Sequence, residues 1–158
     1  MTGDSQDKNW ISTNVPANAA DLRIRVAGLD FDARLEELSA PFTCSAVRTL
    51  LPLTRKMIHC RWSGEGVWIP MAPWRLPWRT ENSTTRPSPG QVLLYAGGRS
   101  EPELLVAYGE CIFNSKSGVI SGNHFLTIVQ NLDSLRELGR RVLWEGAKDC
   151  SIELIRER

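Results

Sequence analysis

Apolar and polar residues alternate regularly near the start of the chain. From Leu22 to Val26 every second residue is apolar and the two residues between are arginines, and the alternation returns from Phe31 to Leu35. A period of two is typical of a strand with one buried face. Gly28-Leu29-Asp30, between the two segments, is a turn sequence. The pattern predicts a β-hairpin over residues 22–35.

A helical period follows this hairpin. Apolar side chains recur at every fourth position, at Phe42, Ala46 and Leu50. Ser39 is a residue type that caps helices, Pro41 suits a first turn, and Pro52 ends the run. We therefore predict one amphipathic helix that packs against the sheet at an end of the fold, with Thr43 and Cys44 as packing residues.

Further short apolar runs between turn sequences predict additional strands. They cover residues 57–62, 67–70, 91–96, 103–108, 111–113, 119–120, 123–129, 142–144 and 150–155. The pair 91–96 and 103–108 is almost continuously apolar, which predicts a central hairpin buried on both faces. A short helix is expected from a cap at Asn131 or Asp133 to Gly139. Without strand–helix–strand repetition, this order indicates a mostly β fold: a closed antiparallel β-barrel with one or two short helices.

The segment from Lys56 to Pro70 concentrates side chains that can carry chemistry. On a strand ending at Trp62, alternation places Met57, His59 and Arg61 on one face. The opposite, core-facing set is Ile58, Cys60 and Trp62. Arg61 could clamp a carboxylate, His59 could transfer a proton, and Glu65 is a third catalytic candidate. An internal ion pair for Arg61 and a structural hydrogen bond for His59 are the alternatives.

Neighbouring segments supply candidate ligand contacts. The substrate-binding candidates are Trp62, Glu81, Asn82, Tyr95, Tyr108, Asn123 and His124. Each also has a structural interpretation as a cap, a turn residue or a core residue with a polar tip. The loop of residues 71–90 is rich in proline, tryptophan and arginine, and loops of this length are often lids or binding segments. Its tryptophans would form the apolar wall of a pocket or a subunit contact.

Composition narrows the classes of function. The chain has 158 residues, is 42% hydrophobic, and carries 19 basic and 18 acidic residues for a net charge of +1. We expect a flexible tail over residues 1–20 and a single domain over residues 21–158. There is no basic run, no apolar run approaches the roughly 20 residues that span a bilayer, and the amino terminus lacks a secretory signal. We therefore expect a cytoplasmic protein without a nucleic-acid or membrane partner.

Metal and cofactor motifs are not recognisable in the sequence. His59 and His124 lie on separate predicted strands without the spacing of a metal motif, and no phosphate-binding glycine loop or nucleophile elbow occurs. We expect no metal and no cofactor. The four cysteines form no CxxC pair and are expected to be buried thiols.

Several short motifs spread over residues 22–155 resemble those of a known family. They are Ala40-Pro41, His59-Cys60-Arg61-Trp62-Ser63-Gly64-Glu65, Glu81-Asn82, Pro89-Gly90, Tyr108-Gly109, Ser121-Gly122-Asn123-His124-Phe125 and Trp144-Glu145-Gly146. The chain is similar to a bacterial family of small cyclophilin-like proteins of unknown function. The resemblance implies a cyclophilin-like barrel and names no reaction. Cyclophilins proper are prolyl isomerases, and their binding groove contains an arginine that follows a histidine. Here Cys60 separates His59 from Arg61, and other positions of that groove also differ.

These features predict a protein that binds, and in one hypothesis converts, a small polar or carboxylate-bearing molecule in a pocket around His59 and Arg61. Two alternatives stay open: a non-catalytic subunit or protein-interaction module, and a peptidyl-prolyl cis-trans isomerase. A homodimer is a further hypothesis, because an aromatic loop such as residues 71–90 often needs cover.

Overall fold

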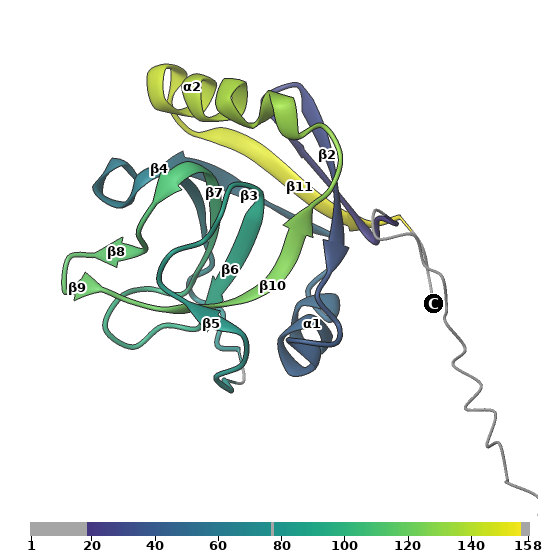
Figure 1. The fold of residues 1–158 in the computed structure, drawn as a ribbon, viewed down its shortest axis with the longest axis vertical. Helices are drawn as coiled ribbons and strands as arrows, with labels where there is room; N and C mark the ends of the chain where they lie inside the picture. Colours follow the sequence, from purple (N-terminus) through teal and green to yellow (C-terminus); the bar gives the residue numbers. More distant parts are fainter. Residues whose placement is uncertain (1–18, 77, 156–158) are drawn as a thin grey trace, which may run out of the picture.

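The computed structural model describes residues 19–76 and 78–155. Within them, eight antiparallel strands form a closed barrel in the order β2-β1-β11-β3-β4-β7-β6-β10, and β10 pairs back onto β2 (Figure 1). The strands are β1 Leu22–Val26, β2 Leu29–Leu35, β3 Leu53–His59, β4 Gly64–Pro70, β6 Gln91–Tyr95, β7 Glu103–Cys111, β10 Gly122–Ile128 and β11 Lys148–Leu154. The predicted mostly β, closed antiparallel barrel is confirmed. The expected tail lies outside the described residues except for Ala19 and Ala20, which are buried.

The N-terminal hairpin forms where the alternation predicts it. Ile24 lies opposite Phe31 on β2 and opposite Ile152 on β11, so its side chain joins apolar residues of both neighbours. All three are buried, whereas Arg25 on the other face of β1 is exposed. A period of two on a sheet with one face in the core explains this segment fully.

The first helix, α1 (Pro41–Arg48), differs from the prediction at its start and on its buried face. Its N-cap is Ala40, not Ser39, and no side chain of the cap residue bonds to the helix. The helix buries Thr43, Cys44 and Val47, while the predicted stripe Phe42, Ala46 and Leu50 is only half-buried. The packing roles of Thr43 and Cys44 are confirmed.

The second helix, α2 (Leu135–Glu145), is longer than predicted. It follows the 3-10 turn η2 (Leu132–Ser134) and continues through Gly139 to Gly146, so the expected strand over residues 142–144 is wrong. Gly139 does not end the helix. A glycine is needed there for packing, because a Cβ atom would collide with the ring of Tyr108. A glycine that usually signals a helix end is here the contact point between α2 and the barrel.

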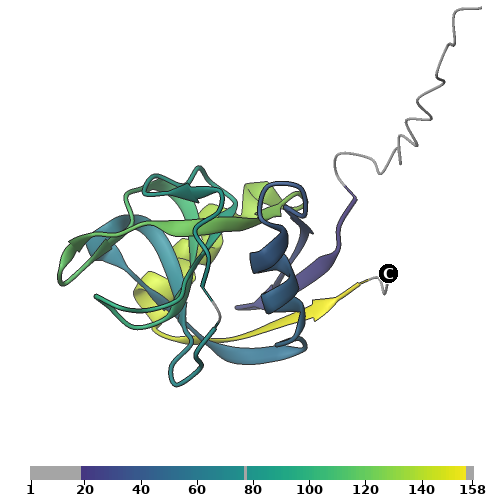
Figure 2. The ribbon, with the colours of Figure 1, turned by 90° about the horizontal axis from the view of Figure 1, so that it is seen from below.

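The two helices lie on opposite sides of the barrel (Figures 1 and 2). Residues of both helices belong to the same apolar cluster as the barrel interior: Cys44 and Val47 from α1, and Leu135, Leu138 and Val142 from α2. Both helices therefore close the main core, in place of the single helix that was expected at one end.

A second apolar cluster covers the outer face of β4, β6 and β7. Its members are Cys60, Trp68, Leu93, Tyr95, Leu105, Ala107, Cys111, Phe113 and Ile120. Phe113 and Ile120 of this cluster flank the small hairpin formed by β8 (Asn114–Ser115) and β9 (Gly118–Val119). The short strand β5 (Ser83–Thr84) pairs with β10. The central hairpin is thus buried on both faces, as predicted.

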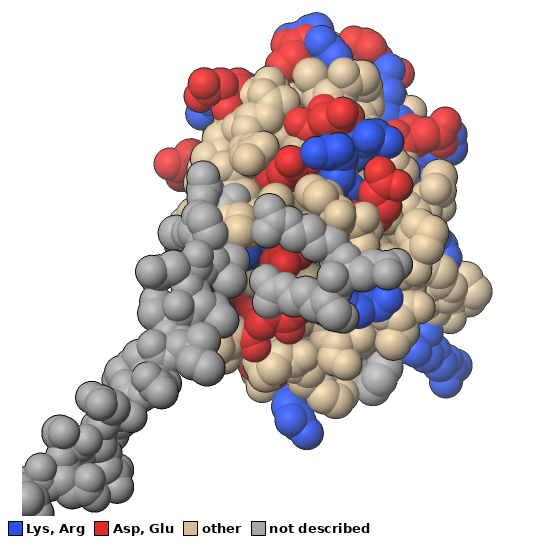
Figure 3. Space-filling model, turned by 90° about the vertical axis from the view of Figure 1, so that its right-hand side faces the viewer, with Lys and Arg blue, Asp and Glu red and all other residues tan. Residues whose placement is uncertain are grey.

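All four cysteines are free, buried thiols, and burial raises the pKa of Cys44 and Cys150 to about 12. The expectation of buried thiols is confirmed. Acidic and basic side chains are interspersed on the face shown in Figure 3, in keeping with the net charge of +1. In the described part of the chain, the helices are too short or too polar to cross a bilayer.

Candidate functional site

The predicted strand around His59 and Arg61 ends earlier than expected. β3 stops at His59, and Arg61–Ser63 form the 3-10 turn η1. The chain then reverses at Gly64 with φ 102°, where a Cβ atom would lie 2.6 Å from the carbonyl oxygen of Glu110. His59 and Arg61 therefore do not share a strand face. Trp62, expected in the core, is 56% exposed.

The imidazole of His59 is half-buried against Tyr108. Its Nε2 lies 2.7 Å from the Tyr108 hydroxyl, and the rings meet edge to face. Burial, followed by the nearby Arg61 charge, lowers the pKa of His59, and burial raises the pKa of Tyr108. Nδ1 of His59 is buried and has no hydrogen-bond partner among the residues described. The pair is neutral at pH 7 and lies between the barrel and α2.

Glu65 and Arg61 are not brought together. Glu65 accepts a hydrogen bond from the Glu110 amide at 3.0 Å and one from Arg136 at 2.9 Å. The amide bond is the main reason that the pKa of Glu65 is lowered, with Arg136 contributing. Arg61 is exposed and makes no ion pair within residues 19–76 and 78–155. His59, Arg61 and Glu65 therefore have separate surroundings: His59 contacts Tyr108, Glu65 pairs with Arg136, and Arg61 is exposed.

Asn123 is fully buried and holds three segments together. Its amide nitrogen donates to the Thr43 hydroxyl at 3.1 Å and to the Arg79 carbonyl at 2.7 Å, and its oxygen accepts from the Glu81 amide at 3.3 Å. The Glu81 carboxylate in turn accepts from the Thr43 amide at 2.5 Å, so it caps α1 from outside the helix. Asn123 and Glu81 anchor α1 and the long loop to β10.

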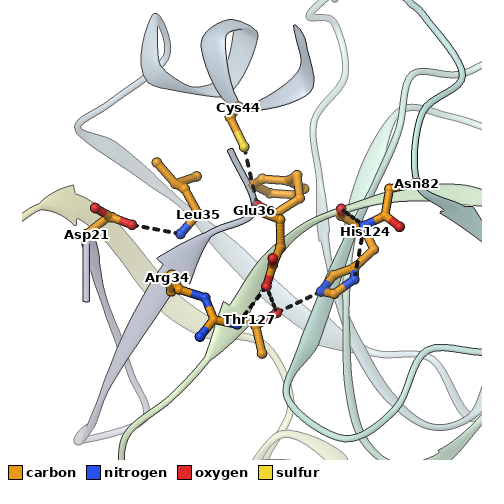
Figure 4. Close-up of polar contacts among 9 residues, drawn as sticks. Asp21, Arg34, Leu35, Glu36, Cys44, Asn82, His124 and Thr127 are labelled. Atoms are coloured by element: carbon orange, nitrogen blue, oxygen red, sulfur yellow. Dashed lines mark hydrogen bonds and ion pairs between the residues drawn. The ribbon is translucent and has the colours of Figure 1, made fainter. Parts of the chain in front are cut away.

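His124 belongs to a separate network on the other face of β10 (Figure 4). Its Nε2 lies 2.7 Å from the Thr127 hydroxyl, and that hydroxyl donates to Glu36 at 2.7 Å. Arg34 donates to the same carboxylate at 3.0 Å. Asn82 donates to the His124 carbonyl at 2.8 Å, and its amide nitrogen lies 3.4 Å from Nδ1 of the ring.

The direction of these bonds fixes the protonation of the network. Because the Thr127 proton points to Glu36, Nε2 of His124 must carry the proton that the Thr127 oxygen accepts. Burial lowers the pKa of His124, with Glu36 opposing the shift. Burial also disfavours the ionised Glu36, but its bonds from Thr127 and Arg34 outweigh this and lower its pKa. The threonine is not activated by the histidine, so the network anchors the loop at Asn82 rather than forming a nucleophile and base.

A different set of residues encloses a cavity of about 600 Å³ on the outer face of the β4–β7–β6 sheet. We call it the Glu103 pocket. It is lined by Trp62, Trp68, Arg99, Ser100, Glu101, Glu103, Asn114, Ser115 and Lys116. Three segments meet there: η1, the turn between β6 and β7, and the β8–β9 hairpin.

Two polar side chains of this pocket, Glu103 and Trp68, have no hydrogen-bond partner among the described residues. Glu103 is 8% exposed, and none of the described residues donates a hydrogen bond to its carboxyl group. Burial, with a smaller contribution from Glu101, raises the pKa of Glu103 to about 8. The indole Nε1 of Trp68 is likewise buried and unpaired within the described part of the chain. Native proteins rarely leave such groups unsatisfied. The Trp68 N–H is closed off from solvent, so the Glu103 carboxyl is the group of this cavity whose hydrogen bonding a ligand could complete.

Hydrogen bonds fasten the walls of the Glu103 pocket to one another. The Ser63 hydroxyl accepts from the Asn114 amide at 3.0 Å, which ties η1 to β8. Ser117 donates to the Arg99 carbonyl at 3.3 Å, which ties the β8–β9 turn to the β6–β7 turn. The Tyr95 hydroxyl accepts from the amides of Arg99 and Ser100 at 3.0 and 3.3 Å. The pocket is therefore pre-formed, and Tyr95 supports its rim.

Only one of the predicted site residues, Trp62, lines the Glu103 pocket. The sequence analysis missed Glu103 and Trp68. A signal was present, because Glu103 begins an apolar run and shares its strand face with the buried Leu105 and Ala107. A carboxylate in phase with core residues is unusual enough to be singled out.

A second open groove of about 610 Å³ adjoins the Glu103 pocket and shares Trp62 and Asn114 with it. Arg86 and Arg136 lie on its walls, but both are exposed. Neither this groove nor the Glu103 pocket includes His59 or Arg61. Among the described residues, no group of three histidine, cysteine or acidic side chains is placed to hold a metal ion.

The fold and the site define a small closed antiparallel β-barrel with a ligand-sized pocket on its outer face. The chain belongs to the DUF3830 family, described as a protein of unknown function, whose family model matches residues 22–154. The expectation of a family of unknown function is confirmed at that level. Comparison with curated proteins finds no match.

Two solved structures share the fold. The structure of McbB in complex with tryptophan has a TM-score of 0.69 and 22% identity, and the match covers 87% of this chain. It covers 45% of the McbB chain, so the present chain spans less than half the length of that protein. The solution structure of the hypothetical protein AF2241 from Archaeoglobus fulgidus has a TM-score of 0.50 and 16% identity, covering 85% of this chain and 93% of its own.

Proposed function

We propose that the protein binds a small polar, carboxylate-bearing organic molecule in the Glu103 pocket. The observation that carries the proposal is the largely buried Glu103 side chain, whose carboxyl group has no partner among the described residues, in a pre-formed cavity of about 600 Å³ with tryptophan walls. Ligand sites in proteins typically have this size, aromatic walls and a few convergent polar groups.

The rim of the pocket supports the carboxylate part of the proposal. Arg99 and Lys116 line the pocket and are exposed, so they are available to an anionic group of a ligand. They would take the role expected for Arg61. The catalytic roles of His59, Arg61 and Glu65 stay predictions, since none of the three lines this pocket.

The tryptophan-bound McbB structure adds limited support. It shows that a protein containing a barrel of this fold can bind a small amino acid, which is a property of McbB. We also propose that the barrel is of the cyclophilin-like type, as its eight closed strands and the helix on each side suggest.

The test is a binding screen with two matched tryptophan variants. Thermal unfolding and tryptophan fluorescence are followed with phenyl- and indole-bearing compounds that carry a carboxylate, an amine, both or neither. The proteins are wild type, Trp62→Ala, and Trp144→Ala as a control, because Trp144 is 74% exposed on α2 and belongs to neither pocket. A ligand at a hundred times its dissociation constant should stabilise the wild type by about 2.7 kcal/mol, roughly 5–10 °C.

We expect at least one compound to bind the wild type and Trp144→Ala equally and to bind Trp62→Ala about tenfold more weakly, because an indole wall is lost. The proposal is wrong if no compound shifts the unfolding temperature, or if binding is unaffected by Trp62→Ala.

A further inference from the structure

Glu103 and Trp68 form what we call the inner end of the Glu103 pocket. Glu103 is a carboxylic acid in phase with buried apolar residues, at the start of β7, next to the indole of Trp68. Buried acids are almost always paired with a cation or with several hydrogen-bond donors. No such partner is found among residues 19–76 and 78–155. The complementary group would have to come from the ligand.

We propose that the inner end of the Glu103 pocket is a subsite for an organic ammonium group, so that the ligand carries a protonated amine beside an aromatic or other apolar group. This inference rests on the proposed function and adds to it the class of ligand. The amine would donate to the Glu103 carboxylate, while the apolar part of the ligand would lie against Trp62.

The walls favour a cation over a neutral donor. The indoles of Trp62 and Trp68 meet edge to face with ring centroids 6.1 Å apart, and both side chains line the pocket together with Glu103. Indole faces attract ammonium ions, and the attraction grows when the site is desolvated. A hydrogen bond from an ammonium to a carboxylate is also about twice as strong as one between neutral groups.

The other charged and titratable groups near Glu103 do not already fill this role. They are Arg99 and Glu101 from the β6–β7 turn, Lys116 from the β8–β9 turn, Tyr95 on β6 and Cys60 before η1. Arg99, Glu101 and Lys116 are exposed, and neither cation forms an ion pair with Glu103. Burial raises the pKa of the Cys60 thiol, which is therefore neutral.

The pH dependence of the binding affinity distinguishes an ammonium ligand from a neutral ligand. In the free protein the Glu103 carboxyl keeps its proton up to about pH 8, because burial raises its pKa. An ammonium ligand requires the carboxylate, so its binding below pH 8 releases a proton and its affinity rises with pH by up to about tenfold per unit. A neutral ligand that bonds to the protonated carboxyl would instead weaken above pH 8.

The experiment compares three probes of nearly the same shape: 2-phenylethylamine, 2-phenylethanol and 3-phenylpropanoate. Calorimetry at pH 6, 7 and 8 gives their affinities and the number of protons released, for the wild type and for Glu103→Gln. The amide keeps the size of the side chain but cannot ionise. We expect the amine to bind the wild type most tightly, with affinity increasing from pH 6 to pH 8 and about one proton released at pH 6. In Glu103→Gln its affinity should fall about tenfold or more and lose the pH dependence.

The inference is overturned if phenylethanol binds as tightly as the amine, if Glu103→Gln leaves the amine affinity unchanged, or if the wild type shows no rise between pH 6 and pH 8. The pH series uses the wild type alone, so it decides the question even if the variant unfolds. Binding of phenylpropanoate that depends on Trp62, without binding of the amine, would preserve the proposed function while rejecting the ammonium subsite. No binding by any compound would reject both.

Discussion

Replacing Asn123 by alanine is expected to lower the free energy of unfolding by about 3 kcal/mol. The side chain is fully buried and makes three hydrogen bonds, to the Thr43 hydroxyl, the Arg79 carbonyl and the Glu81 amide. Removing it leaves buried partners unsatisfied, and each such group costs roughly 1–3 kcal/mol. Urea denaturation measures the loss.

Asn82→Gly is the matched control for this prediction, because Asn82 has a φ of 47° that would strain an alanine. Its amide is exposed and donates to the His124 carbonyl at 2.8 Å, so its loss should cost about 1 kcal/mol. Hydrogen exchange should show that Asn123→Ala releases the loop at residues 79–81 together with the start of α1. Equal destabilisation by the two variants would mean that Asn123 does not hold these segments.

Glu103→Gln is expected to stabilise the protein increasingly as the pH rises. The pKa of Glu103 is raised from its ordinary value of 4.5 to about 8 in the folded state. Between these values the folded state binds more protons at this site than the unfolded state does, so the free energy of unfolding falls with rising pH. The ionised carboxylate thus costs stability, on the order of 5 kcal/mol above pH 8, and a glutamine avoids that cost.

The measurement is chemical denaturation of wild type and Glu103→Gln from pH 5 to pH 9. The difference between their free energies of unfolding isolates Glu103, because other titrating groups such as His59 and His124 are common to both. Glu101→Gln is the control, since Glu101 is exposed and should change stability by less than about 0.5 kcal/mol. A difference that stays constant from pH 5 to pH 9 would show that Glu103 ionises normally.

The barrel could be predicted from the sequence because its strands are determined locally. The alternation from Leu22 to Leu35 places every second side chain in the core, and a shift of one residue would expose all of them. The central strands are covered on both faces by the interior cluster and the outer cluster, which explains their continuous apolar runs.

The errors arose where distant contacts override a local pattern. Gly139 carries a helix-end signal, but the ring of Tyr108 requires a residue without a side chain at that point of α2. The alternating pattern from Met57 to Trp62 extends beyond the end of β3, so it predicts a strand where the chain in fact forms the turn η1. There the Ile112 amide donates to the Ser63 carbonyl at 2.9 Å, and Asn114 bonds to the Ser63 hydroxyl, which hold η1 in place. Neither contact is visible in a window of sequence.

The candidate site was only partly predictable for a related reason. Trp62, one of the predicted ligand contacts, lines the pocket, whereas the side chains of Asn123 and His124 bond to other segments of the protein, and their ligand roles stay predictions. The Glu103 pocket is built from three turns that are far apart in the chain. The local pattern marks Glu103 as unusual, but only the fold shows that the β8–β9 hairpin and the β6–β7 turn form a pocket with it.

The most direct test of the account is the titration of the Glu103 carboxyl group itself. Its carboxyl carbon-13 resonance, assigned with Glu103→Gln, is followed with pH in the free protein and with saturating 2-phenylethylamine. We predict a midpoint near pH 8 in the free protein, because burial raises the pKa, and a midpoint well below pH 7 when the ammonium is bound. A midpoint near 4.5 without ligand would contradict the account, because burial would then leave the carboxyl group as stable in its ionised form as in water.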